Sequence, residues 1–302
     1  MDYFITENCS IKNEITVVDK YAISFLESIT AQITSVKKVI VTDSTPQNYQ
    51  NSVKELSLEI DASVGLTDNG VAIVIHGLNA DGDFEQRIFI RGDIFHSFCL
   101  YHYGQRLVDQ LSEKLDNEQV ASFKASAIIA FRVVLHEIGH AVNYERLYSA
   151  YGYLTPDRKA YYLPKELDKF AEYEMMTIWS EYFAERFAFS VSRESAAPSE
   201  DDVMELLHDS RSYGVVENAG KTFRLLYWYA LYIAYYHNRN EACPLNAEDD
   251  HHGLLLMLKS IGDALNKLFI EQSTWDFESI FAKLGCLFVE LYNVKYMNVE
   301  RS

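Results

Sequence analysis

The sequence predicts an α+β protein with a mixed first half and an all-helical second half. The runs of β-branched residues that are typical of strands are found before residue 91, and the segments after residue 165 place apolar residues at helical spacing. We therefore expect two lobes. A mixed α/β lobe over residues 1–148 ends in a long helix, and a helical lobe covers residues 149–302.

The first lobe is predicted to contain a helix, a strand and a hairpin, in that order. Apolar residues recur at helical spacing over Val17–Thr30, and Lys38–Thr42 is a β-branched run followed by turn-forming residues. Two further runs, Val71–His76 and Phe84–Ile90, are separated by an Asp-Gly turn signal and predict an antiparallel hairpin. Residues 56–63 fit either a second strand or the end of a helix.

A long helix is predicted from about residue 116 to Leu147, with Asn117 as its N-cap. A tyrosine-rich connection follows from Tyr148 to Pro164, and it is interpreted as either a loop or lid over a site or a packed surface excursion. The remaining helices are predicted at Lys165–Ser192, Ser199–Ser210, Glu217–His237, His251–Glu271 and Thr274–Asn293.

Composition and charge narrow the classes of partner. The 302 residues are 48 % apolar and 24 % charged, which is a globular composition, and the net charge is −17. Basic residues do not form runs longer than two, so neither nucleic acid nor a membrane surface is expected as a partner. No signal sequence is recognisable, and the apolar stretch Leu225–Tyr236 is shorter than the roughly 20 residues that cross a bilayer. We therefore expect a cytoplasmic location.

The chemistry is predicted to centre on the sequence VVLHEIGHAV, residues 133–142, within the long helix. His136 and His140 are four residues apart, so on a helix their imidazoles lie one turn apart on the same face and can bind one metal ion. Glu137 lies beside them and has the chemistry of a general base. The rest of the segment is uncharged, as expected for a helix that is packed on its other faces. The alternative is a buried helix with two incidental histidines.

A catalytic zinc site usually has three protein ligands and a water, so a third ligand is required. The four cysteines lack the CxxC spacing that would indicate a cysteine zinc site. Glu181, in the sequence WSEYFAERFA, borders the apolar face of a predicted helix and is the best candidate. Glu185 follows one turn later and is a candidate to accept a hydrogen bond from a ligating histidine. The alternatives are a solvated face with Arg186 in a local ion pair, or ligation by Glu172 or Glu174.

These residues predict metal-assisted hydrolysis. Zinc lowers the pKa of a bound water towards neutrality and polarises a carbonyl, while Glu137 removes the proton and later hands it to the leaving amine. A donor for the developing oxyanion is also required. On chemistry alone the candidates are Tyr213, Tyr227, His208 and His237.

The HEIGH sequence with its uncharged flanks and the later EYFAERFA segment resemble the gluzincin branch of the zinc metallopeptidases. The closest resemblance is to the ImmA/IrrE-type family, whose later helix has the pattern Glu-x-x-Ala-x-x-Phe-Ala. This resemblance implies a zincin-like fold in which His136, His140 and Glu181 bind one zinc ion. It implies that Glu137 is the general base, and Glu185 matches a polar position four residues after the third ligand. It also implies a sheet edge beside the site that pairs with an extended substrate.

The expected function is that of a zinc-dependent endopeptidase that cuts a protein or peptide substrate in the cytoplasm. The first alternative is a regulatory or binding protein that keeps a zincin scaffold without turnover. The second is a structural protein in which the motif is accidental. The sequence leaves the substrate and the oligomeric state open.

Overall fold

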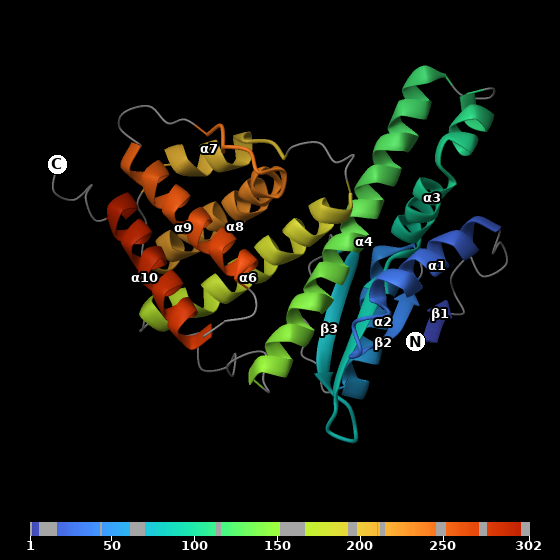
Figure 1. Cartoon of the computed structure of the whole chain (residues 1–302), viewed down its shortest axis with the longest axis horizontal. Coiled ribbons are helices and arrows are strands. Elements are labelled where there is room, and N and C mark those ends of the chain that lie inside the picture. Colours follow the sequence, from blue (N-terminus) through green and yellow to red (C-terminus); the bar gives the residue numbers. More distant parts are fainter. Residues whose placement is uncertain are drawn as a thin grey trace. The chain divides into compact units, whose positions relative to one another are not determined.

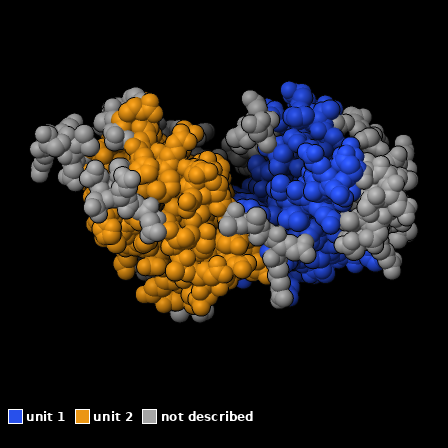
Figure 2. Space-filling model, turned by 90° about the horizontal axis from the view of Figure 1, so that it is seen from above, with its two compact units in different colours: residues 1–154, 191–195 blue, residues 155–190, 196–302 orange. Residues whose placement is uncertain are grey.

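The structure is a computed structural model, and Figure 1 shows the order of its helices and strands. It describes residues 2–5, 17–42, 44–60, 70–112, 116–151, 167–192, 198–209, 211, 215–245, 252–271 and 277–296. The chain divides into two compact units, residues 1–154 with 191–195 and residues 155–190 with 196–302 (Figure 2). All described strands belong to the first unit, and the described elements of the second unit are helices. The predicted α+β class is therefore confirmed.

The first unit is built on a sheet whose described strands have the order β1-β2-β4-β3. The strands are β1 (Asp2–Ile5), β2 (Val36–Val41), β3 (Ala72–Leu78) and β4 (Phe84–Ile90). β1, β2 and β4 are parallel, and β3 pairs with β4 as the predicted antiparallel hairpin. β3 is therefore an edge strand of the described sheet.

Asn79 closes the turn of the hairpin. Its side-chain oxygen accepts the backbone N–H groups of Asp81 and Asp83 at 3.0 and 2.9 Å, and its own N–H donates to the carbonyl of Asp83 at 2.9 Å. Gly82 has a φ of +82°, a conformation that glycine adopts without steric cost. Because the pairing alternates along an antiparallel strand, the even-numbered residues of β3 direct their backbone groups away from β4.

The helices of the first unit confirm part of the prediction and extend it. They are α1 (Val17–Thr30), α2 (Pro46–Ser57), α3 (Gly92–Ser112) and α4 (Asn117–Tyr151). The predictions of α1 and α4 are confirmed, whereas α2 and α3 were not predicted. α2 continues as a short 3₁₀ helix over Leu58–Ile60, so the described part of segment 56–63 is the end of a helix and not a strand.

The two faces of the sheet are covered by different helices. On one face, Tyr49 and Val53 of α2 form a buried cluster with Ile75 and Phe89 of the hairpin. Gln86 points its side chain to the opposite face, where its amide donates to the carbonyl of Ala141 in α4 at 2.9 Å. The long helix α4 therefore packs on the face opposite α2.

α4 begins with a capping box at Asp116. The Asp116 carboxylate accepts the backbone N–H of Gln119 at 2.8 Å, and the Gln119 side chain accepts the N–H of Asp116 at 3.2 Å. The predicted N-cap, Asn117, is therefore wrong by one residue. Residues 148–151 of the predicted connection belong to α4, and its remaining residues, 152–164, lie outside the described part of the chain.

One described helix segment, Asn117–Ala150 of α4, is long and apolar enough to cross a membrane by length and composition. Half of its most apolar window is buried inside the protein. A single helix of this kind is weak evidence for a membrane span, because a core helix that packs on a sheet has the same composition.

The helices predicted in the second half of the sequence are all present. They are α6 (Leu167–Val191), α7 (Asp201–His208), α8 (Val215–Arg239), α9 (His252–Ile270) and α10 (Phe277–Tyr296). The core of this second unit is aromatic, with Trp179 and Tyr182 of α6, Tyr229 of α8 and Phe288 of α10 fully buried. The tyrosine-rich composition of this part of the sequence therefore serves packing in the first place.

His102 of α3 is a core histidine of the first unit. Its ring centroid lies 4.7 Å from that of Phe25 and 4.8 Å from that of Phe98, and its Nε2 is buried without a hydrogen-bond partner. Burial lowers the pKa of His102 to about 4. Below roughly pH 6.5 the unfolded chain therefore takes up a proton at His102 that the folded chain rejects until about pH 4.

The unfolding free energy of the parent protein is expected to decrease as the pH falls through this window. In His102→Phe this decrease should be smaller. The expected reduction between pH 7.5 and 4.5 is about 1 kcal/mol, less than the full linkage value because the ring is partly exposed. Urea unfolding at both pH values measures it. His96→Gln, at an exposed position of the same helix, is the control, and an equal effect of both substitutions would contradict the assignment to His102.

Candidate metal centre

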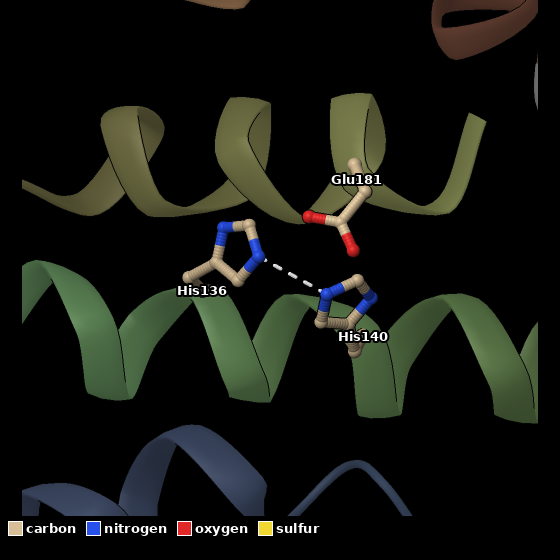
Figure 3. Close-up of side chains that lie close together, drawn as sticks. All are labelled: His136, His140 and Glu181. Carbon is tan, nitrogen blue, oxygen red and sulfur yellow. Dashed lines mark hydrogen bonds between the residues drawn. The ribbon is translucent and has the colours of Figure 1, made fainter. Parts of the chain in front are cut away.

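α4 presents His136 and His140 one turn apart on one face (Figure 3). Their Nε2 atoms are 3.0 Å apart, so both rings direct the same nitrogen towards one point. Two imidazole nitrogens at this distance either share a proton or bind a common cation. Val134 and Leu135 bury the other side of the helix, as the uncharged flanks of the motif predicted.

Glu181 of α6 completes a group of three candidate ligands (Figure 3). The ligand atoms of His136, His140 and Glu181 all lie within 4.8 Å of one another. Ligands that bind one zinc ion at about 2.1 Å in tetrahedral geometry lie about 3.4 Å apart, so the separation of these atoms is compatible with a shared ion. The set leaves a fourth position for water. It is the one such group of His, Cys, Asp and Glu side chains among the described residues.

The two alternative ligands considered from the sequence, Glu172 and Glu174, lie outside this group. Glu172 instead packs against Gly285 of α10, where an added Cβ would come within 2.9 Å of the Glu172 side chain. The structure therefore brings together the three residues that the sequence favoured, and it places Glu172 in a helix contact.

Tyr227 of α8 contacts the third ligand. Its hydroxyl donates to Oε2 of Glu181 at 3.3 Å. A hydrogen bond of this kind helps to orient a carboxylate as a metal ligand. Tyr227 is thus the one of the four oxyanion-donor candidates that touches a predicted ligand among the described residues.

The other three candidates have different surroundings. Nδ1 of His237 lies 2.8 Å from the hydroxyl of Tyr182, and burial lowers the pKa of His237 to about 4. His208 is exposed at the end of α7. Tyr213 lies outside the described residues. Chemistry alone did not separate Tyr227 from His237, because the partners of both residues lie on another helix, α6.

Glu137 is held by the edge strand of the sheet. The backbone N–H of Val74 in β3 donates to Oε2 of Glu137 at 3.0 Å. This hydrogen bond helps to orient the carboxylate of Glu137. The sequence did not predict the role of Val74, because every residue except proline has a backbone N–H and the residue type therefore does not mark this donor.

Glu185 and Arg186 follow Glu181 on α6 and are both buried, at 2 % and 8 % exposure. The predicted alternative of a solvated face is therefore wrong for these two positions. The Arg186 guanidinium donates to the Tyr182 hydroxyl at 3.2 Å and to the side chain of Asn266 at 2.8 Å. The hydrogen bond from a ligating histidine to Glu185 stays a prediction.

Comparisons of the chain with protein families, with curated proteins and with solved structures find no match. The function is therefore argued from the chemistry of the site and from the two motifs that carry the family resemblance.

Glu181→Ala is expected to weaken zinc binding by about 100-fold or more, because it removes one of three protein ligands. Tyr227→Phe removes only the hydrogen bond that orients the ligand, so the expected loss of zinc affinity is about 10-fold. Competition against a chelating dye measures both values.

Glu174→Ala serves as the control, since it removes an acidic residue of the same helix that lies outside the cluster. Unchanged zinc affinity is expected for this variant. A large loss in Glu174→Ala together with no loss in Glu181→Ala would show that the ligand assignment is wrong.

Proposed function

We propose that this protein is a zinc-dependent endopeptidase of the gluzincin type, with a zincin-like fold and the closest likeness to the ImmA/IrrE-type family. The proposal rests on the grouping of His136, His140 and Glu181, with Glu137 beside them and held by a backbone N–H. Nitrogen and oxygen ligands in a set of three favour Zn²⁺, whereas Ca²⁺ and Mg²⁺ prefer six or more oxygen ligands. We propose a protein or peptide substrate and a cytoplasmic location, with neither nucleic acid nor a membrane as partner.

The chemistry divides between the metal and the residues of α4. A zinc ion held by His136, His140 and Glu181 would supply a Lewis acid that polarises the scissile carbonyl and would lower the pKa of a bound water to about 7. Glu137, which the N–H of Val74 helps to orient, would accept a proton from the water as the water oxygen bonds to the carbonyl carbon. It would then give this proton to the amide nitrogen as the C–N bond breaks, which releases the amine and returns Glu137 to its ionised form.

Tyr227 and β3 each support this reaction. The Tyr227 hydroxyl donates to Glu181 and would orient its carboxylate as a zinc ligand. The even-numbered residues of β3 direct their backbone N–H and C=O groups away from β4. An extended peptide that pairs along this edge would lie beside Glu137, which Val74 of the same strand contacts.

Glu137→Gln is expected to retain zinc and to lower hydrolysis of an unfolded protein substrate by about 100-fold or more, because the amide cannot accept the water proton. The measurement combines metal analysis of protein purified without chelator with cleavage of casein. Glu118→Gln, at an exposed position in the first turn of α4, is the matched control and should keep full activity.

Two outcomes would contradict the proposal. Less than about one zinc per chain in the parent protein would remove the metal centre. Bound zinc without cleavage of any substrate would favour the silent zincin scaffold that regulates or binds a partner.

A further inference from the structure

A row of aromatic rings in the first unit begins at the candidate ligand His140. The His140 ring stacks on Tyr144 with the centroids 5.7 Å apart, and Tyr144 lies 4.5 Å from the ring of His76. His76 lies 6.2 Å from Phe84, which in turn stacks on Tyr148 at 4.2 Å. The four rings beyond His140 are called the aromatic ladder here; they are His76, Phe84, Tyr144 and Tyr148.

The periods of helix and strand place these rings on one surface. The ladder residues of α4 follow His140 at intervals of four, so they line one stripe of the helix. On the hairpin, His76 and Phe84 are diagonal neighbours, because Leu78 lies opposite Phe84. Gln86, opposite His76, points to the same face and binds α4. The ladder is therefore continuous from the helix to the hairpin.

The aromatic ladder is only half buried. Each of its four side chains is partly exposed, and Leu78 beside it is 48 % exposed. The aromatic residues of the helical core, such as Tyr182 and Tyr229, are fully buried by comparison. Exposed apolar surface that adjoins a candidate metal ligand is typical of a ligand-binding surface rather than of core packing.

The edge strand determines which substrate residue meets the ladder. The outward-directed positions of β3 include Val74, His76 and Leu78. The N–H of Val74 donates to Glu137 and is therefore not offered to a peptide. Between Glu137 and the hairpin turn, a peptide that pairs with β3 does so along His76 and Leu78. Directly opposed residues of paired strands have their side chains on the same face. The side chain of the peptide residue opposite His76 therefore lies against Tyr144.

We propose that the aromatic ladder is a subsite for an aromatic side chain of the substrate, at the position opposite His76. This inference rests on the proposed endopeptidase function and adds a substrate class to it: extended segments that carry Phe, Tyr or Trp at that position. An aromatic side chain gains both burial and ring stacking there, whereas an alanine leaves the rings in water.

The test uses pairs of quenched fluorescent peptides that differ only in Phe or Ala, placed in turn at each position around the cleavage site. One position is expected at which Phe raises kcat/KM by about 10- to 100-fold. The double variant Phe84→Ser with Tyr148→Ser should bring this ratio close to one while it keeps its zinc. Phe123→Ser, at a position of α4 that is 44 % exposed and outside the ladder, is the control that should keep the ratio.

A ratio that the double variant leaves unchanged would overturn the subsite, as would the absence of a preference at every position. If the double variant does not fold, Tyr148→Leu removes one ring and keeps an apolar side chain at the end of the ladder, and a smaller decrease in the ratio is expected. If the parent protein cleaves no peptide, the proposed function fails by itself. Fluorescence anisotropy of the same peptides on zinc-loaded protein then tests the subsite: preferential binding of Phe, lost in the double variant, supports it, and equal binding overturns it.

Discussion

The geometry of the candidate metal centre depends on three polar contacts that fix α4 against the sheet. Glu137, Ala141 and Glu145 follow one another at intervals of four and form one stripe of the helix. Glu137 accepts an N–H of β3, the Ala141 carbonyl accepts the amide of Gln86, and Glu145 accepts the N–H and hydroxyl of Thr34. The amide nitrogen of the fully buried Gln86 also donates to the Ser35 hydroxyl at 2.7 Å, so a rotation of α4 would remove one of its two acceptors and leave one buried N–H unsatisfied, at a cost of about 1–3 kcal/mol. The neighbouring stripe of histidines and aromatic rings is thereby held in one orientation.

Helices and strands in which the spacing of apolar residues is not interrupted were predictable from the sequence. Examples are α1, the hairpin and the helices of the second unit. The helices α2 and α3 were not, because each begins at a residue that usually breaks a pattern. Pro46 suggests a turn, yet it occupies the first turn of α2, where its missing N–H is not needed. Gly92 opens α3 because a Cβ there would come within 2.8 Å of the Thr42 carbonyl. The explanation for Gly92 depends on a neighbour, Thr42, that a local sequence window does not contain.

The same distinction applies to the site. The two histidines and the base are related by the helical period alone, so the spacing was sufficient to select them. Glu181 lies on another helix, and its selection required a choice among several acidic residues by the polarity of their surroundings. Tyr227 was one of four candidates by chemistry, and only the tertiary contact with Glu181 distinguishes it. Contacts between site residues on different helices are set by packing. A local pattern in a single sequence does not reveal them.

Because Glu137 is held by a main-chain N–H, every residue except proline at position 74 preserves the contact. The buried side chain of Val74 is constrained by packing, but the hydrogen bond to Glu137 does not depend on which side chain position 74 carries. A one-residue insertion or deletion in β3 has the opposite effect, since it turns each following side chain to the other face and moves the outward-directed N–H groups along the strand. The orientation of the base is thus robust to point mutation and sensitive to the length of the hairpin.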